Sequence, residues 1–260
     1  MTKVEKPVPA GFNQCKVCAY VETGTPEICY ACTVKHTERL AQDGCGVCEL
    51  PLKCDGACEN YPCAWYIERR FDRNFAVAMK TKGGPMEKAI YRYKYDGRTS
   101  WATIFARILI GYLDAHRERM TGLTGFDMII PSPTNVDPDG GRPFDHTRLV
   151  LERAAVIAPG RWPIFLDEPV IVKTRPTPQL ATKKWQEARK IAEGDLRTAL
   201  RVPKPALTRN KSILVFDDVF TIGFTLREVA KRLREDGDAR RVCGITLARQ
   251  PRKPQTVAAA

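Results

Sequence analysis

One stretch, residues 211–233, constrains the fold of this chain more than any other. It begins with an apolar run at 213–216, of the kind that forms a strand buried on both faces. The run ends in two adjacent carboxylates, Asp217 and Asp218, and a loop with a single glycine follows at 221–225. This order predicts a buried strand that places an acidic pair at the start of a loop.

A helix is predicted directly after this loop. Its apolar positions recur at i, i+3, i+4 and i+7, namely Leu226, Val229, Ala230 and Leu233. Thr225 and Glu228 have the spacing of a capping box, in which a hydroxyl and a carboxylate satisfy free amides at the start of a helix. We therefore expect the helix to begin at Thr225.

The order of strand, acidic pair, loop and helix suits a sugar phosphate. Free amides at the start of a helix bind anions, and the helix dipole favours negative charge there. Thr221 and Thr225 add hydroxyl donors, and Gly223 permits close approach of a ligand. Asp217 and Asp218 can hold ribose hydroxyls or hydrated Mg²⁺, which prefers one or two carboxylates plus substrate phosphates. The alternative is an acidic strand end without a ligand, as in any doubly wound fold.

This segment resembles the ribose-5-phosphate-binding signature of type I phosphoribosyltransferases, an apolar run with two acids and a loop rich in Thr and Gly. The resemblance implies that Asp217 and Asp218 are catalytic residues that contact the ribose of 5-phosphoribosyl 1-diphosphate (PRPP). It also implies that the loop cradles the 5-phosphate, through Thr221, Ile222, Gly223, Phe224 and Thr225. The family commonly has Thr-Thr-Gly where this chain has Thr221-Ile222-Gly223, so one hydroxyl is lost while its backbone amide remains.

The net charge of +12 is unevenly distributed along the chain. Residues 1–66 carry six Lys or Arg and eight Asp or Glu, a net of −2, which leaves 36 basic and 22 acidic residues, a net of +14, for the remainder. A basic domain suits phosphorylated substrates and nucleic acid equally. No stretch approaches the roughly 20 apolar residues that span a bilayer, and residues 1–7 lack the apolar core of a secretory signal. We expect a soluble, cytoplasmic protein without a membrane span.

Nine of the ten cysteines lie within residues 15–63, in spacings that favour metal over disulfides in a cytoplasmic chain. Two C-x-x-C pairs predict a first tetrahedral zinc site with the ligands Cys15, Cys18, Cys29 and Cys32. Five thiols compete for a second site, for which we favour Cys45, Cys48, Cys58 and Cys63, with Cys54 as the alternative. Ligands of the two sets can also interleave, and His36 is a substitute ligand. The prediction is two structural zinc ions per chain.

The charge of the cysteine-rich segment bears on its role. It is slightly acidic before any thiolate is counted, which favours docking of a protein partner over direct phosphate binding. Cys243 stands apart from this segment, in an apolar run at 242–247, and is expected to be buried in a strand.

The remaining runs predict an α/β fold. Apolar runs at 126–130, 170–172 and 241–248 indicate strands, and helices are predicted at 101–112 and after 140–145. Strands that alternate with helices favour a mainly parallel sheet. Because ligands collect at the carboxyl ends of such strands, Ser132, in the loop after the first of these runs, is a candidate diphosphate contact.

Two basic segments have both a functional and a structural interpretation. Residues 91–95 alternate Tyr with Arg and Lys, a pattern that stacks bases and pairs phosphates, and that equally describes a half-buried edge strand or a helix end. Residues 173–189 are rich in cations and can close over a diphosphate leaving group, or form a solvated surface segment. The candidate contacts in the second segment are Lys183, Lys184 and Arg189.

Over nearly the whole chain, the order of features resembles the ComF family, the amidophosphoribosyltransferase-like competence proteins. The shared features are an N-terminal zinc ribbon, a lysine-bearing stretch at 92–97, the Pro131-Ser132-Pro133 loop, a counterpart of an Arg-Gly-Phe-Asn segment at 142–145, and the PRPP signature. The resemblance implies a type I phosphoribosyltransferase-like parallel sheet flanked by helices and preceded by a small zinc-ribbon module.

These expectations divide the chain into a zinc-binding module (1–66), a connecting or hood segment (67–98), a phosphoribosyltransferase-like domain (99–250) and a disordered tail (251–260). The expected function is binding of PRPP with Mg²⁺ and displacement of its diphosphate by an unknown acceptor, a pentosyl transfer. The alternative is a catalytically weak or inactive protein of the DNA-uptake type that binds single-stranded DNA with the same fold. Expected partners are PRPP or another sugar phosphate, single-stranded nucleic acid, and a protein bound by the zinc module.

Overall fold

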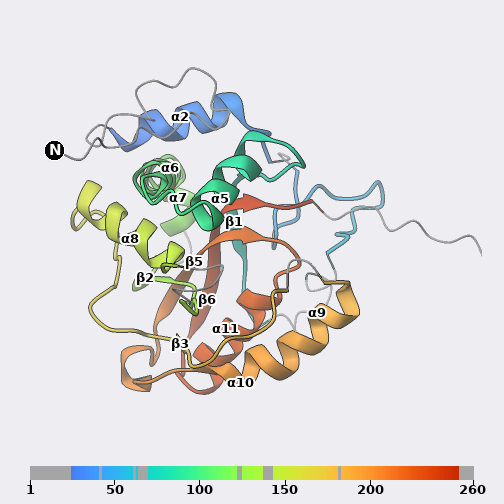
Figure 1. Ribbon diagram of the computed structural model, residues 1–260, viewed down its shortest axis with the longest axis vertical. Helices are drawn as coiled ribbons and strands as arrows, with labels where there is room; N and C mark the ends of the chain where they lie inside the picture. Colours follow the sequence, from blue (N-terminus) through green and yellow to red (C-terminus); the bar gives the residue numbers. More distant parts are fainter. Residues whose placement is uncertain are drawn as a thin grey trace, which may run out of the picture.

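The structure is a computed structural model that describes residues 25–40, 43–60, 63, 70–121, 125–136, 143–180 and 183–251. Its centre is a four-stranded sheet of β1 (Asn74–Met79), β2 (Met128–Pro131), β5 (Ser212–Phe220) and β6 (Arg241–Arg249). The strand order is β1-β6-β5-β2, and every neighbouring pair is parallel. The predicted α/β fold with a parallel sheet is therefore confirmed, and all four carboxyl ends lie at one edge (Figure 1).

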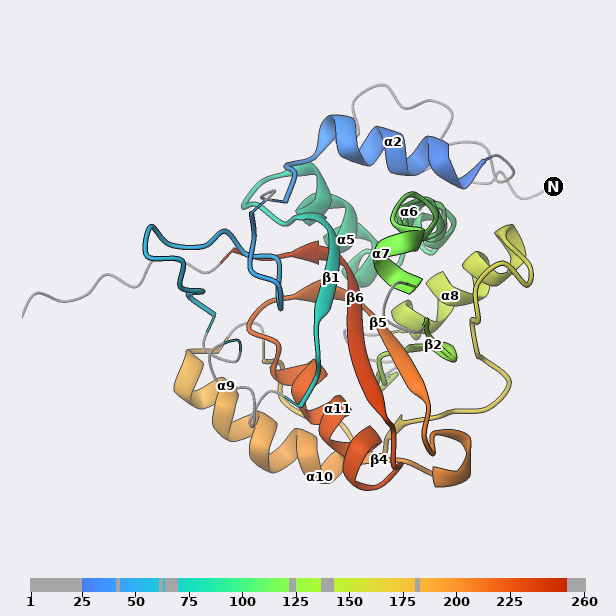
Figure 2. The same ribbon diagram turned by 180° about the vertical axis from the view of Figure 1, so that it is seen from behind.

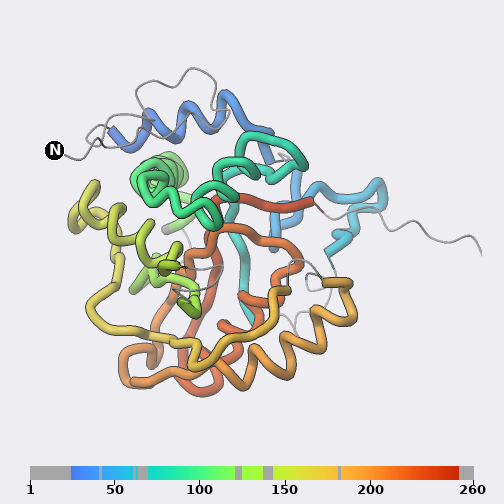
Figure 3. The backbone as a smooth tube through the Cα atoms, viewed as in Figure 1, coloured from blue at the N-terminus to red at the C-terminus, as the bar shows by residue number. Residues whose placement is uncertain are grey.

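Helices cover both faces of this sheet (Figures 1 and 2). One face carries α5 (Pro85–Tyr95), α6 (Trp101–Ala115), α7 (Arg117–Thr121) and α8 (His146–Ile157). Outside them, α2 (Pro26–His36) crosses α6. The other face carries α11 (Phe224–Glu235) and a segment of α9 (Trp185–Ile191), the π-helical turn η1 (Ala192–Leu196) and α10 (Arg197–Ala199). Figure 3 follows residues 158–180, which leave α8 on one face and pass to the other face of the sheet.

The burial of β5 explains why its sequence reads as a continuous apolar run. Ile213 and Val215 pack into the core against α11, whereas Leu214 and Phe216 pack into the core beneath α6 and α8. Successive side chains of a strand point to opposite faces, so a strand covered on both faces needs apolar residues at every position.

A glycine sets the distance between the two outermost helix layers. A Cβ on Gly111 of α6 would lie 2.5 Å from the Cβ of Tyr30 and 2.9 Å from the carbonyl oxygen of Pro26, both on α2. Only glycine permits this close approach, so α2 packs directly on the backbone of α6.

The cysteine-bearing segment covers the edge strand β1. The amide of Asn74 donates to the carbonyl of Val47 at 2.7 Å, and the amide of Ala76 donates to the Glu49 carboxylate at 2.7 Å. The amide of Met79 donates to the carbonyl of Glu38 at 3.0 Å. These bonds satisfy the free edge of the sheet, which would otherwise be open to pairing with another chain.

Two expectations about local structure are corrected. The helix after β5 begins at Phe224 rather than Thr225, because Gly223 adopts the left-handed conformation (φ 96°, ψ 11°) and takes the position before the helix. The strand expected at 170–172 is only β3 (Val172–Lys173), which pairs antiparallel with β4 (Leu200–Arg201) outside the central sheet.

Two other expectations are confirmed. Residues 91–95 form the end of α5, so the helix interpretation is confirmed. Cys243 is fully buried in β6, as predicted. Within the described ranges, no helix has the length and apolar character to cross a membrane.

Candidate functional site

The acidic pair lies near the carboxyl end of β5. The side chains of Asp217 and Asp218 leave opposite faces of the strand, because they are consecutive. Asp218 is 5% exposed, and the Lys94 ammonium at the end of α5 lies 2.7 Å from its Oδ2. Nε2 of His146, the first residue of α8, lies 3.9 Å from its Oδ1. Three elements distant in sequence therefore converge on one carboxylate.

The pKa values of the two carboxyls shift in opposite directions. Burial, and next the neighbouring charge of Asp218, raise the pKa of Asp217 to about 7, while Lys94 opposes the shift. Burial would also raise the pKa of Asp218, but the charges of Lys94 and His146 outweigh it and hold that pKa below its ordinary value. One carboxylate is thus compensated by a lysine, and its neighbour is not.

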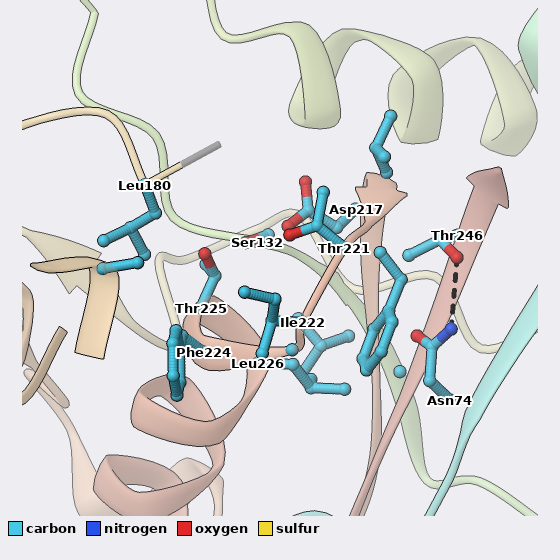
Figure 4. A pocket seen from close by; sticks show the side chains of 16 residues that line it. Asn74, Ser132, Leu180, Asp217, Thr221, Ile222, Phe224, Thr225, Leu226 and Thr246 are labelled. Carbon is cyan, nitrogen blue, oxygen red and sulfur yellow. Dashed lines mark hydrogen bonds between the residues drawn. The ribbon is translucent and has the colours of Figure 1, made fainter. Parts of the chain in front are cut away.

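The loop after β5 forms a small pocket at the start of α11 (Figure 4). The Thr225 side chain lies on the α11 side of this pocket beside Leu180, and the bonded pair Asn74–Thr246 lies on the opposite side. The enclosed space is only about 30 Å³. It opens toward a larger cleft, with which it shares Ser132, Asp217, Thr221 and Thr225.

Gly223 determines the shape of the loop. Its φ of 96° belongs to the left-handed region, and a Cβ at this position would lie 2.5 Å from Cζ of Phe220. Both observations require glycine. Ile222 packs against the cluster of Ala188, Ala192 and Phe224, so its side chain joins the loop to α9 and η1 where the commoner threonine would offer a hydroxyl.

The larger cleft has a volume of about 680 Å³ and runs along the carboxyl edge of the sheet. Its charged lining comes from α5, from the ends of strands of the central sheet and from β3. The cations are Lys80, Lys88, Arg92, Lys94 and Lys173, and the anions are Glu87, Asp96, Asp217 and Asp218. A cleft of this size accommodates a metabolite of moderate size, and its cations suit a phosphorylated one.

The structure brings together most of the residues predicted for the site. Asp217, Asp218, Ser132, Thr221 and Thr225 all line the cleft, and Ile222, Gly223 and Phe224 line the small pocket. Lys183, Lys184 and Arg189 are absent from the described lining. Lys183 pairs with Glu187 at 2.7 Å and Arg189 with Glu193 at 2.8 Å, while Lys184 precedes α9. From the same region, Lys173 and residues 177–180 reach the cleft instead.

Two residues at the centre of the site were not assigned a role from the sequence. Lys94 was seen only within a family-like stretch, and His146 received no assignment. The chain has three histidines, and His146 directly follows Asp145, whose side chain accepts from the amide of Arg148 and caps α8. The sequence signal for His146 is its position: it starts a helix, directly after a capping residue, in the connection that follows a strand.

A second site consists of four cysteines. The Sγ atoms of Cys45, Cys48, Cys58 and Cys63 all lie within 4.8 Å of one another, and Cys54 is exposed and outside the group. Hydrogen bonds from the other three thiols hold the pKa of Cys45 well below its ordinary value. Four converging thiols match the ligand set of a structural zinc site, so the predicted second set is brought together as proposed.

The first predicted zinc set is described only in part. Cys15 and Cys18 lie outside the described residues. Cys29 and Cys32 lie on α2, where Cys29 is buried in the core shared with α6, and His36 is in the last turn of the same helix. No metal-type cluster among the residues that the structure describes includes any of these three side chains.

The fold and the site define an α/β protein with an acidic pair and a glycine-bearing loop at the carboxyl edge of a parallel sheet. The same protein carries a four-cysteine cluster. No protein-family model matches the chain. The chain is 26% identical over 212 residues to the DNA utilization protein YhgH of Escherichia coli strain K12, a match that covers 82% of this chain and 86% of that protein. It is 28% identical over 217 residues to the DNA utilization protein YhgH of Salmonella typhi, with the same coverage.

Proposed function

We propose that this protein binds PRPP together with Mg²⁺ in the cleft at the carboxyl edge of the sheet. One observation carries the proposal. The paired carboxylates of β5 lead directly into a loop held by a left-handed glycine at the start of a helix, and both open into the same cleft. Carboxylates select ribose hydroxyls and Mg²⁺, whereas the loop selects a phosphate, so together they match a ribose 5-phosphate.

The two carboxylates supply the oxygen ligands that Mg²⁺ prefers. Ligand atoms of His146, Asp217 and Asp218 lie within 4.8 Å of one another. Asp217 and Asp218 would hold the ion through oxygen, and the uncompensated charge of Asp217 gains most from a cation. The ion would offset the negative charge of the diphosphate as it leaves.

The loop would hold the 5-phosphate at its mouth rather than inside. The space of about 30 Å³ beneath it suits one or two water molecules, whereas Thr221 and Thr225 face the larger cleft as well. In the transfer, a nucleophilic acceptor would form a bond to C1 of the ribose while the C1–oxygen bond breaks. Diphosphate would leave with the electron pair, and Lys80 and Lys173 on the cleft wall would offset its charge.

Calorimetric titration tests this proposal. PRPP with Mg²⁺ is titrated into the parent chain, into an Asp217→Asn/Asp218→Asn variant, and into an Asp167→Asn variant whose exposed carboxylate lies elsewhere. We expect binding in the parent and in Asp167→Asn, and at least a hundredfold loss in the double variant. Equal binding in all three would contradict the proposal.

A second candidate function is binding of single-stranded DNA, and α5 provides the observation that favours it. Tyr91 and Tyr95 are 57% and 44% exposed, and their ring centroids lie 5.1 Å apart at the rim of the cleft. Lys88 and Arg92 lie on the same helix and line the same cleft. Exposed aromatic rings beside cations stack bases and pair phosphates. The name of the relatives, DNA utilization protein, agrees with this candidate.

Oligonucleotide binding distinguishes the two candidates. If α5 binds single-stranded DNA, affinity for oligothymidine falls steeply with salt, and Tyr91→Ala/Tyr95→Ala loses about 1–3 kcal/mol per base stacked. Tyr91→Phe/Tyr95→Phe is the matched control and retains the affinity, because it keeps both rings. Failure of the parent chain to retain the oligonucleotide at low salt would exclude this candidate.

A further inference from the structure

Arg249, the last residue of β6, joins the four-cysteine cluster to the loop after β5 (residues 221–225). Arg249 is 1% exposed. Nε donates to the carbonyl of Cys48 at 2.9 Å, and Nη2 lies 3.6 Å from the Sγ of Cys48. Nη1 donates to the carbonyl of Phe220 at 3.1 Å and also to the carbonyl of Thr221. One buried side chain therefore contacts a cysteine of the cluster and two consecutive peptides of the loop.

The contacts of Arg249 determine where the loop amides point. In a trans peptide, the carbonyl and the following amide point in opposite directions. Because the carbonyls of Phe220 and Thr221 turn toward Arg249, the amides of Thr221 and Ile222 turn away from it. The guanidinium also lies 4.9 Å from the centre of the Phe220 ring, and that ring fills the space beside Gly223. Arg249 thus fixes both the peptides and the ring that shape the loop.

Among the described residues, no Asp or Glu forms an ion pair with Arg249, and its guanidinium contacts backbone carbonyls and the Sγ of Cys48 instead. A buried cation is costly unless negative charge lies close by. Four thiolates around one Zn²⁺ carry a formal charge of 2 − 4, or about −2, and Cys48 is the member that contacts Arg249. A loaded cysteine cluster therefore supplies the missing charge.

We propose that Arg249 is a positioning residue through which zinc in the Cys45–Cys48–Cys58–Cys63 cluster sets the conformation of the loop at 220–223. Loss of the metal removes the anionic partner of Arg249 and frees the Cys48 peptide that holds it. The guanidinium then no longer fixes the carbonyls of Phe220 and Thr221. The effect on PRPP affinity rests on the proposed function, whereas the effect on the loop itself does not.

The test is amide NMR of the full chain before zinc removal with a chelator, after it, and after reloading with zinc alone. We expect the cross-peaks of Thr221, Ile222 and Gly223 to move or broaden when zinc is removed and to return on reloading, while those of α8 stay fixed. Arg249→Lys with zinc bound should show displaced loop peaks, while the peaks of Cys45 and Cys58, which Arg249 does not contact, stay in place. Cys54→Ser, outside the cluster, should match the parent.

Two results would overturn the inference. The first is that zinc removal moves the peaks of residues 45–50 but leaves the loop peaks in place. The second applies if zinc removal unfolds the chain: the loop peaks of zinc-loaded Arg249→Lys then coincide with those of the parent. Neither measurement uses PRPP, so a loop that responds in a protein that fails to bind PRPP would refute the proposed function alone. If the protein binds PRPP, we expect zinc removal to lower its affinity for PRPP about tenfold.

Discussion

At the scale of single residues, the site contains two neighbouring carboxylates that repel each other. Asp217 and Asp218 are adjacent, Asp217 half-buried and Asp218 buried, and only Asp218 forms an ion pair with a lysine. A ligand-free pair of this kind costs stability, and a bound cation recovers it. Perturbed carboxyls in a cleft are a common mark of functional sites, and here they coincide with the loop after β5.

The first prediction concerns the stability of Asp217→Asn. The folded-state pKa of about 7 lies above the ordinary value of 3.8, so the stabilising contribution of the protonated form is complete below about pH 4 and is lost as pH rises through 7. Asparagine does not ionise, so at pH 8 the free energy of unfolding of the variant should exceed that of the parent by about 1–2 kcal/mol, or roughly 2–6 °C in Tm. The difference should be smaller at pH 5. Thermal melts without Mg²⁺ measure this. A lower Tm of the variant at pH 8 would contradict it.

The second prediction concerns Gly223→Ala. The left-handed φ and the clash with Phe220 together should cost about 1–3 kcal/mol and displace the loop. Because we propose that the loop amides bind the 5-phosphate, their displacement should lower PRPP affinity at least tenfold while Tm falls by only a few degrees. Gly46→Ala, at a position with nothing within 4 Å of its Cβ, is the control. Unchanged affinity in Gly223→Ala would mean that the loop does not bind the ligand.

At the scale of elements, α11 is held to the segment beside it by a buried carboxylate. Glu228 is fully buried, accepts from Arg197 at 2.7 Å, and pairs with Arg227 at 2.8 Å. The same Arg227 pairs with Glu193 of η1 at 3.1 Å. This network fixes the helix whose first turn forms part of the loop after β5, so packing far from the cleft supports the site.

The third prediction is that Glu228→Gln destabilises the protein. Removal of the carboxylate takes away the anionic partner of Arg197 and leaves Arg227 paired with Glu193 alone, at a cost of about 2–4 kcal/mol in urea unfolding. Glu235→Gln, at an exposed position of the same helix, should change stability by less than about 0.5 kcal/mol. Equal effects of the two substitutions would contradict this role for Glu228.

Local pattern predicted the elements well where one face or both faces are apolar. The runs at 213–216 and 241–248 became β5 and β6 because burial on both faces leaves an unmistakable run. The capping-box spacing of Thr225 and Glu228 misled, because Glu228 is used by Arg197 and Arg227 and the left-handed Gly223 starts the helix instead. Capping is a local rule, and here tertiary ion pairs outweighed it.

At the scale of the whole molecule, the cysteine segment is part of the architecture of the site. It covers the edge of β1 through bonds to Val47 and Glu49, and it contacts the cleft loop through Arg249. Sequence spacing identified the four thiols, but not where they would lie. Likewise, Lys94 meets Asp218 across 124 positions (218 − 94), a contact that only the packing of α5 over the sheet creates.

The fourth prediction concerns metal content and stability. Cys58→Ser should lose the zinc held by the cluster and lower Tm, because the remaining three thiols leave the tetrahedral site incomplete. Cys54→Ser should keep the metal and the Tm of the parent. Elemental analysis of the purified chain counts the ions, with two expected for the parent and one for Cys58→Ser. Equal metal content in the two serine variants would contradict this ligand set.

We propose that one cleft holds the ribose, the metal and the 5-phosphate of PRPP. A crystal structure of the full chain with PRPP and Mn²⁺ in place of Mg²⁺ tests it most directly, since manganese is located by its anomalous signal. We expect a manganese peak beside Asp217 and Asp218, and the 5-phosphate at the mouth of the loop at 221–225. A sugar phosphate bound elsewhere on the protein, with no metal at the acidic pair, would contradict it.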